Sequence, residues 1–281
     1  MRTVHTVAEL REQIAEWKRA GERVGLVPTM GNLHAGHLEL VARARSLARR
    51  VVVSIFVNPL QFGPNEDFDR YPRTLPADAA KLDAAGCDLL FAPDVAQMYP
   101  QGRENLSTVS VPALNSLLDG EFRPGHFDGV ATVVSILFNQ VQPDLAVFGE
   151  KDWQQLQVVR RMVADLHLPL TIVGHPTARD TDGLALSSRN QYLSAEERAL
   201  APEIFRTLGG LSDSLKAGRR DFEALQREAL QRLEGFGFKA QYVEIRAPDL
   251  SAATADGREW ILLVAAFLGR TRLIDNRYLC L

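Results

Sequence analysis

The sequence predicts an α/β fold: a Rossmann-like, doubly wound parallel sheet followed by a smaller C-terminal α+β domain. The run 51–57 is apolar and β-branched, which is typical of a central strand buried on both faces. Such runs alternate with amphipathic helical segments up to about residue 176, as in parallel βαβ sheets. Beyond that point two helical segments precede three strand candidates, which is the order of an α+β unit. We therefore expect two domains, residues 1–176 and 177–281.

Hydrophobic periodicity, turn residues and cap signals place the individual elements. In the first domain we expect helices over residues 7–20, 38–50, 76–86, 130–141 and 154–166, and strands over 23–27, 51–57, 88–93, 145–148 and 170–173. Loops are expected over 60–73 and 123–129, and residues 106–111 fit either a strand or a loop insertion. In the second domain, a loop over 177–190 precedes helices over 195–216 and 221–236 and strands over 239–246, 260–267 and 272–278.

Composition and charge exclude several classes of partner. A formal net charge of -3 gives no electrostatic case for binding nucleic acid. The two cysteines, Cys87 and Cys280, lack metal-type spacing and suit a reducing compartment. Charged residues interrupt the N-terminal segment where a signal peptide would be apolar, and no apolar run approaches the roughly 20 residues that span a bilayer. We expect a cytoplasmic protein that binds neither nucleic acid nor membrane.

The stretch 27–38, VPTMGNLHAGHL, connects a predicted strand to a predicted helix through a tight turn. This geometry presents backbone N–H groups and the positive end of a helix dipole to an anion. His34 and His37 are three residues apart, so they fall on one side of the first helical turn. Gly36 between them leaves room for a phosphate. We infer a polyphosphate site, while a structural role or half of a zinc site stays open for the pair alone.

Two further groups follow strand ends, where open α/β sheets normally bind ligands. Asn58 and Gln61 come after the second predicted strand, and their amides can hold a hydroxyl or a carboxylate without adding charge. The stretch Gly149-Glu150-Lys151-Asp152 follows a later strand, and its lysine can place a positive charge on a phosphate. Taken singly, the amides could be turn residues and the charged stretch a solvated loop.

The stretch Leu186-Ser187-Ser188-Arg189-Asn190 is a second candidate anion site. Its hydroxyls and guanidinium follow a Gly-containing loop and could bind a transferring phosphoryl group. A helix-capping turn is the alternative. The histidine pair, Lys151 and this stretch, in that order along the chain, suit one nucleotide site.

This combination of motifs resembles the nucleotidyltransferase superfamily that includes class I aminoacyl-tRNA synthetases, and more closely the pantothenate synthetase (pantoate–β-alanine ligase) family. The match runs through residues 27–37, 54–62, 71–74, 123–129, 148–155, 182–190 and 263–276, so it covers essentially the whole chain. It implies that ATP and (R)-pantoate give pantoyl adenylate and pyrophosphate, and that β-alanine then displaces AMP to give pantothenate. It also implies a nucleotide- and pantoate-binding first domain, and a second domain that covers the site and contributes to a homodimer.

The resemblance further assigns site residues. His37 and His34 would stabilise charge on the phosphates, with His37 as the family's proton donor and Lys151 as a third catalytic group. The substrate contacts would come from Gln61, Gln155 and Asn58, and the ATP contacts from Met30, Gly31, Asn32, Leu33, His34, Ala35, Gly36, His37, Gly149, Glu150, Lys151, Asp152, Ala178, Leu186, Ser187, Ser188 and Arg189.

Magnesium is expected to accompany ATP. Family members often carry two adjacent acids where this chain has Ala77-Asp78, so we assign no protein residue as a metal ligand. Three alternatives remain. Another small-molecule nucleotidyltransferase would need a basic pocket where Asn58, Gln61 and Gln155 stand. A nucleotide sensor without turnover leaves the histidine pair and Lys151 unexplained, and an RNA-binding synthetase relative would carry a basic appended domain.

Overall fold

A computed structural model of the chain describes residues 1–64 and 66–281. The chain forms two compact units, each with its own hydrophobic core. The first unit comprises Met1–Glu150 and Gln154–Pro176, and the second comprises Lys151–Trp153 and Thr177–Leu281. Residues Lys151–Trp153 thus belong with the second unit although they follow a strand of the first.

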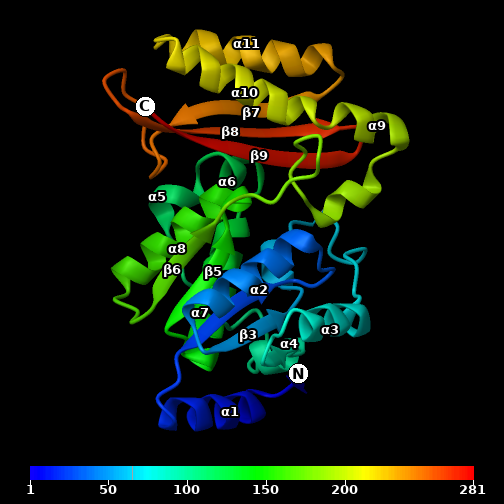
Figure 1. The fold of residues 1–281 in the computed structure, drawn as a ribbon, viewed down its shortest axis with the longest axis vertical. Coiled ribbons are helices and arrows are strands. Elements are labelled where there is room, and N and C mark those ends of the chain that lie inside the picture. Colours follow the sequence, from blue (N-terminus) through cyan, green and yellow to red (C-terminus); the bar gives the residue numbers. More distant parts are fainter. Residues whose placement is uncertain (65) are drawn as a thin grey trace. The chain divides into compact units, whose positions relative to one another are not determined.

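The first unit is built on a six-stranded parallel sheet with the order β1-β4-β3-β2-β5-β6 (Figure 1). Its strands are β1 (Arg2–Val4), β2 (Val24–Thr29), β3 (Arg50–Ile55), β4 (Leu89–Phe91), β5 (Leu145–Gly149) and β6 (Thr171–His175). Its helices are α1 (Val7–Arg19), α2 (Ala35–Leu47), α3 (Leu75–Ala84), α4 (Val95–Met98), α5 (Pro112–Asn115), α6 (Asp119–Phe122), α7 (His126–Val141) and, apart from its first residue, α8 (Trp153–Asp165), with the 3₁₀ turn η1 (Pro59–Gln61). The 3₁₀ turn η2 (Glu150–Asp152) begins in this unit and ends in the second.

The strand order reverses between β2 and β5. Strand β2 pairs with β3 on one side and with β5 on the other, all in parallel. From β2 the chain winds outward through β3 and β4, and from β5 it winds the opposite way to β6. The crevice outside the carboxyl ends of two strands at such a switch point is where open α/β sheets bind ligands. The segments after β2, β3 and β5 therefore begin at one edge of this sheet.

Helices cover both faces of this sheet because successive strand side chains point to opposite faces. Leu26 and Val52 pack with α1, α7 and α8, whereas Val27, Val51 and Val53 pack with α2 and α3. All five side chains are buried, and full burial of one such side chain contributes about 1.5–3 kcal/mol. This two-sided burial is why the central strands read as continuous apolar runs.

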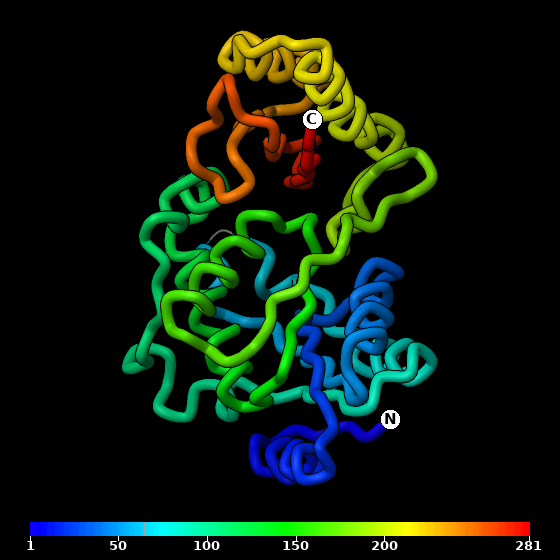
Figure 2. Tube along the Cα trace, turned by 60° about the vertical axis from the view of Figure 1, so that its left-hand side comes forward, coloured from blue at the N-terminus to red at the C-terminus, as the bar shows by residue number. Residues whose placement is uncertain are grey.

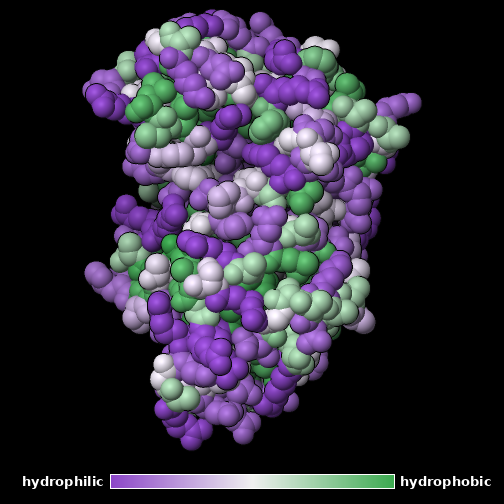
Figure 3. All heavy atoms as spheres, in the orientation of Figure 1, coloured by the Kyte–Doolittle hydropathy of each residue, from purple (hydrophilic) through white to green (hydrophobic). Residues whose placement is uncertain are grey.

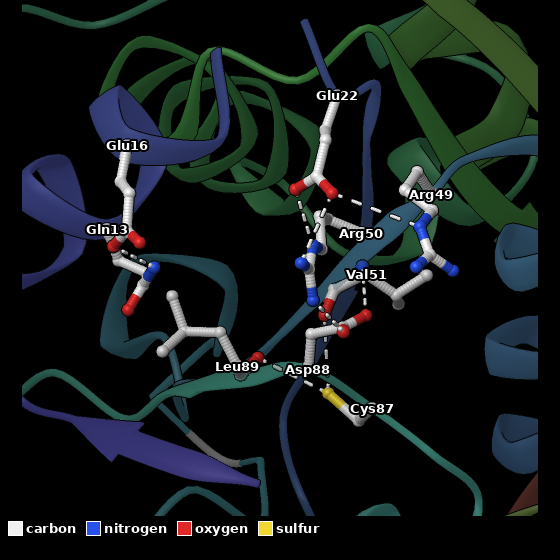
Figure 4. Close-up of polar contacts among 9 residues, drawn as sticks. All are labelled: Gln13, Glu16, Glu22, Arg49, Arg50, Val51, Cys87, Asp88 and Leu89. Carbon is white, nitrogen blue, oxygen red and sulfur yellow. Dashed lines mark hydrogen bonds and ion pairs between the residues drawn. The ribbon is translucent and has the colours of Figure 1, made fainter. Parts of the chain in front are cut away.

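Paired charges close the amino end of the sheet (Figure 4). The Arg50 guanidinium donates to Glu22 from Nε at 2.6 Å and to Asp88 from NH1 at 3.1 Å. The other Asp88 oxygen accepts the Val51 amide at 2.9 Å. The hydrogen bond from Arg50 holds the pKa of the Glu22 carboxyl below its usual value. Burial raises the pKa of the neighbouring Cys87 thiol to about 11.

The second unit is a three-stranded antiparallel sheet with helices packed on it. Alternate residues of its central strand, including Trp260 and Leu262, pack with Leu208 and Leu225 from two helices. Figure 2 shows these helices, α10 and α11, on the same side of the strands. The elements are η3 (Ser188–Tyr192), α9 (Ala195–Leu200), α10 (Glu203–Lys216), α11 (Phe222–Gly235), β7 (Lys239–Arg246), β8 (Glu259–Leu268) and β9 (Thr271–Cys280).

Three boundaries differ from the sequence predictions for physical reasons. Helix α2 begins at Ala35 and ends at Leu47, so both histidines lie at its first turn. The predicted helix 195–216 is two helices, because Pro202 has no N–H and separates α9 from α10. The predicted loop 123–129 already contains the start of α7 at His126, which Gly125 precedes with a φ of +80°.

Short elements account for the other differences. Strand β1 is not predicted, because three residues at a sheet edge carry no usable periodicity. Residues 106–111 form no strand, which favours the loop interpretation. Residue 65 of the predicted loop 60–73 lies outside the described residues. The predicted fold class is confirmed.

On the face seen in Figure 3, hydrophilic residues predominate and hydrophobic residues lie between them. Within residues 1–64 and 66–281, no helix combines the length and the apolar character needed to cross a membrane.

Candidate active site

The turn after β2 has an unusual backbone. Gly31 has a φ of +84° and Asn32 a φ of +50°, in the left-handed region that favours glycine and tolerates asparagine. A Cβ at Gly31 would lie 3.1 Å from the Ile55 side chain and 3.2 Å from that of Asp78. The Thr29 hydroxyl donates to the β3 carbonyl of Ser54 at 2.8 Å and accepts the Gly31 amide at 3.2 Å. The turn therefore bends tightly against β3 and α3.

Asp78 of α3 holds the next two amides of this turn. Its side chain is buried, with 0% exposure, and it accepts the Asn32 and Leu33 N–H groups at 2.8 Å each. The Thr74 hydroxyl donates to the same carboxylate at 2.9 Å. The amides of Gly31, Asn32 and Leu33, all predicted ATP-binding residues, are thus directed inward. Their contribution to an ATP site would be the shape of the turn.

The two histidines stand where α2 begins. His34 is the N-cap residue and His37 lies in the first turn, with ring centroids 4.1 Å apart. The His34 amide donates to Nδ1 of His37 at 3.3 Å, so a neutral His37 carries its proton on Nε2. The amides of Ala35 and Gly36 have no acceptor one turn earlier, because they are the first of the helix. Helix amides, dipole and imidazoles together favour an anion here.

Asn58, predicted to contact substrate, is buried and hydrogen-bonded to neighbouring protein groups. It is 1% exposed, and its Oδ1 accepts the Tyr99 hydroxyl at 2.6 Å and the Leu60 amide at 3.1 Å. Its Nδ2 donates to the Gly129 carbonyl and to Oε1 of Gln61, both at 3.1 Å. Asn58 therefore caps the η1 turn and orients the Gln61 amide. Burial raises the pKa of Tyr99, which keeps that phenol a donor.

Gln61 is brought against the histidine turn. Its Nε2 lies 3.0 Å from the sulfur of Met30, the first residue after β2. Both residues are only partly buried. The first unit thus places a predicted pantoate-binding amide beside the predicted phosphate-binding turn.

A chain of polar contacts fixes the Gln61 backbone. The Gln61 carbonyl is 2.8 Å from Nδ1 of His126 and accepts from Arg123 at 3.3 Å. Arg123 also donates to Nε2 of His126 at 3.0 Å and to both Glu66 oxygens at 2.6 and 2.7 Å. Burial, followed by the charge of Arg123, lowers the pKa of His126 to about 4. A neutral His126 with its proton on Nδ1 satisfies both partners.

Gly129 allows η1 to approach α7. A Cβ at this position would lie 2.3 Å from the Leu60 carbonyl oxygen and 2.8 Å from the Gln61 amide nitrogen. Only glycine permits this packing without a shift of η1. Asp78, Tyr99, His126 and Gly129 escape identification from the residues alone, although the last two lie in the matched motif 123–129.

Gln154 and Gln155 are neighbours with different environments. Gln154 is 4% exposed, donates to the carbonyls of Leu114 and Leu117 at 2.8 and 2.7 Å, and accepts the Asp119 amide at 3.0 Å. Gln155 is partly buried, and its side chain makes no hydrogen bond to another described residue. This contrast favours Gln155 as the glutamine available to a ligand.

Lys151 is held by the second unit. Its carbonyl accepts from Asn276 at 2.8 Å. Trp153, two residues later, donates to the Pro248 carbonyl at 2.9 Å and stacks on Tyr278. The predicted stretch 149–152 is therefore divided: Gly149 and Glu150 belong to the first unit, and Lys151 and Asp152 to the second.

Hydrogen bonds anchor the predicted anion-binding stretch 186–190 of the second unit. Arg179 donates to both oxygens of Asp275 at 2.7 and 2.8 Å, and the Leu186 amide donates to the Ala178 carbonyl at 2.9 Å. Ser187 caps η3 by accepting the Arg189 amide at 3.2 Å. The capping interpretation is thus correct for Ser187, and its hydroxyl hydrogen can still serve an anion. Residues 186–190 are all partly buried.

Among the described residues, no group of three or more His, Cys, Asp or Glu side chains is arranged to hold a metal ion. Magnesium bound with a nucleotide is held largely by phosphate oxygens and water. The donors present are therefore compatible with magnesium that arrives with ATP.

A turn at the switch point of a doubly wound sheet, leading into a helix amino end, is where α/β domains of this class bind phosphate-bearing ligands. The family model for "Pantoate-beta-alanine ligase" matches residues 2–278. The chain belongs to this family, and it is a ligase of pantothenate biosynthesis. The family predicted from the motifs is confirmed, and the individual site residues remain predictions.

Relatives cover the full length of the chain. Pantothenate synthetase of Pseudomonas fluorescens (strain Pf0-1) is 59% identical over 280 residues, which are 99% of this chain and 98% of that protein. The crystal structure of pantothenate synthetase from Thermus thermophilus has a TM-score of 0.90 at 50% identity and covers 99% of both chains. Pantoate-beta-alanine ligase from Francisella tularensis, complexed with "Beta-gamma ATP and Beta-alanine", has a TM-score of 0.83 at 33% identity, covering 99% of this chain and 97% of that one.

Proposed function

We propose that this chain condenses (R)-pantoate with β-alanine in two half-reactions, using ATP and forming pantoyl adenylate. The observation that carries the proposal is the contact between Gln61 and Met30, which joins a small polar binding group to the histidine turn at the switch point of the sheet. A phosphate-binding turn alone would suit many nucleotide enzymes. An uncharged amide beside it suits a small carboxylic acid as the second substrate.

In the first half-reaction a pantoate carboxylate oxygen attacks the α-phosphorus of ATP, and the bond to the pyrophosphate oxygen breaks. Both reactants are anions, so alignment and charge neutralisation supply most of the rate. The amino end of α2 and the Nε2–H of His37 are suited to the leaving pyrophosphate, with His34 beside them. Lys151 and Arg189 would add positive charge.

Pantoate would be held by neutral amides. Gln61 and Gln155 can orient its hydroxyl and carboxylate without opposing its negative charge at the phosphorus. Asn58 acts through Gln61, because its own amide is buried and engaged with protein groups. ATP would contact the stretches 30–37, 149–152 and 186–189 and the Ala178 backbone, and Gly31, Asn32 and Leu33 would shape their stretch without donating amides.

In the second half-reaction the β-alanine nitrogen attacks the acyl carbon of pantoyl adenylate. A carbon–nitrogen bond forms, the bond to the AMP phosphate oxygen breaks, and the nitrogen loses a proton. No protein nucleophile is required, because the adenylate is already the activated acyl group.

Magnesium bound to ATP would supply further neutralisation of phosphate charge, and no protein ligand to it is assigned. We also propose a cytoplasmic homodimer. The compartment is supported by two cysteines that form no disulfide, and the dimer by the family resemblance. Sedimentation should give twice the chain mass of 31.2 kDa, and a mass of one chain would contradict the dimer.

The reaction is tested with purified protein, ATP, pantoate, β-alanine and magnesium. The proposal predicts AMP, pyrophosphate and pantothenate in equal amounts, with no pantothenate when any one substrate is omitted. ATP consumption that is unchanged without pantoate would exclude the proposed function. Release of ADP would indicate activation by phosphoryl transfer instead of adenylation.

A further inference from the structure

We propose that Asp78 is a positioning residue for the first half-reaction, holding the turn 31–33 so that the histidine pair and the amino end of α2 meet the leaving pyrophosphate. Lys81, one turn further along α3, assists by donating to the Leu33 carbonyl of the same turn. This inference rests on the proposed two-step reaction. It adds to that reaction a buried residue that acts through the turn and not by contact with a substrate.

The contacts form a clamp on the backbone between the strand and the helix. The Asp78 carboxylate takes the amides of Asn32 and Leu33, one on each oxygen, both at 2.8 Å. The ammonium of Lys81 donates to the Leu33 carbonyl at 2.6 Å. Asp78 and Lys81 are three residues apart on α3, so they share one face of it. Leu33 is therefore fixed at both its N–H and its carbonyl, directly before His34.

The chemistry of the clamp requires a carboxylate. Asp78 receives three donors, two amides and the Thr74 hydroxyl, while 0% exposed. An asparagine has a single acceptor oxygen, and its amide group would face a backbone N–H. A buried negative charge near a polyphosphate site is also unfavourable for binding ATP by Coulomb repulsion. The Asp78 carboxylate has a structural reason to be there, because it holds the left-handed turn at Gly31 and Asn32.

The consequence is specific to one half-reaction. The turn leads into the groups that suit the pyrophosphate, which is present in adenylation and has left before β-alanine attacks. A displaced turn should slow adenylation and leave aminolysis of pantoyl adenylate largely unchanged. A residue that only stabilised the fold would affect both steps alike.

The experiment compares the two half-reactions in the full-length protein. Adenylation is followed by pyrophosphate release from ATP and pantoate, and aminolysis by pantothenate formation from synthetic pantoyl adenylate and β-alanine. For Asp78→Asn we expect adenylation at saturating ATP to fall about 100-fold, the scale of an ångström-size misplacement, with aminolysis within about 3-fold of the wild type.

Two variants accompany it. Lys81→Met keeps the aliphatic stem of an exposed residue that should not be needed for folding, and we expect adenylation about 5-fold slower with aminolysis unchanged. Asp83→Asn is the matched control: the same change on the same helix, at a carboxylate that pairs with the N-terminal ammonium and not with the turn. Both its half-reactions should match the wild type.

Equal loss of both half-reactions in Asp78→Asn and Lys81→Met, or loss in neither, would overturn the positioning role. Recovery of Asp78→Asn adenylation at high magnesium would also overturn it, in favour of a metal ligand. If Asp78→Asn does not fold, Lys81→Met alone decides through the ratio of the two rates. A wild type that fails to convert pantoyl adenylate and β-alanine would contradict the proposed function itself, a result separate from any difference between variants.

Discussion

The two ends of the parallel sheet use similar residues for different purposes. At the amino end, Asp88 accepts a strand amide and its charge is balanced by Arg50, which also binds Glu22. At the carboxyl end, Asp78 accepts two turn amides, and the groups beyond it, the first turn of α2 and Gln61, are partly buried or exposed. The amino end satisfies its charges within the protein. The carboxyl end uses buried groups to hold residues that are less buried, as expected at the edge where open α/β sheets bind ligands.

The largest effect should come from His37. Replacing it by alanine removes the donor that we propose stabilises charge developing in the transition state, so adenylation should slow about 10²–10³-fold, while the affinity for ATP changes little. Single-turnover pyrophosphate release and equilibrium ATP binding measure the two quantities. Equal losses in both would make His37 a binding residue only and would weaken the contrast between the sheet ends.

Gly129 should rank next. In Gly129→Ala the added Cβ meets the Leu60 carbonyl at 2.3 Å and displaces η1 with Gln61. We expect kcat/KM for pantoate to fall about 10²-fold and unfolding free energy to drop by about 1–3 kcal/mol. Gly210→Ala is the matched control, because a Cβ there meets nothing within 4 Å and the residue lies in α10. That variant should be no less stable than the wild type and should have unaltered kinetics.

An effect of intermediate size is expected in the pH dependence of the unfolding free energy. Burial lowers the pKa of His126 from 6.5 to about 4, so between these values the unfolded chain binds a proton that the folded chain excludes. Unfolding free energy should therefore be fully retained above pH 6.5 and fall as pH drops toward 4, by up to about 3 kcal/mol.

The variant His126→Asn keeps an N–H donor toward the Gln61 carbonyl and does not titrate. Urea unfolding at several pH values should give it a flatter profile than the wild type between pH 6.5 and 4. Parallel profiles would contradict a lowered pKa of His126 in the folded chain.

The smallest effect should come from the amino end. Arg50→Met breaks the partly exposed pairs with Glu22 and Asp88, and we expect a loss of about 1 kcal/mol in the first unit. That corresponds to a melting temperature lower by about 2–4 °C. The kcat of both half-reactions should stay at the wild-type value. A large kinetic effect would break the division between the two ends.

The sequence predicts the fold because its strongest signals are periodic. The central strands are apolar on both faces, as in β3, and the helices between them are amphipathic. The family follows from motif spacing. Boundaries at caps are less visible: the start of α2 at Ala35 depends on His34 acting as N-cap, and histidine is not a usual capping residue.

The supporting residues of the site could not be predicted from the residues alone. Asp78, Tyr99 and Gly129 act through contacts with residues about 40 to 70 positions away in the chain, such as Tyr99 with Asn58 and Gly129 with Leu60. A lone aspartate in a helix or a glycine in a predicted loop has no periodic signature. Asn58 is predicted to touch substrate; its side chain is buried and donates to Gln61, and its contact with substrate stays a prediction.

The most direct test of the central claim is exchange of labelled pyrophosphate into ATP. Reversible adenylation of pantoate at the carboxyl end of the sheet predicts exchange that requires pantoate and magnesium and proceeds without β-alanine. It should be lost in His37→Ala and kept in Arg50→Met. Exchange that needs β-alanine, or that proceeds without pantoate, would contradict a pantoyl adenylate formed at the histidine turn.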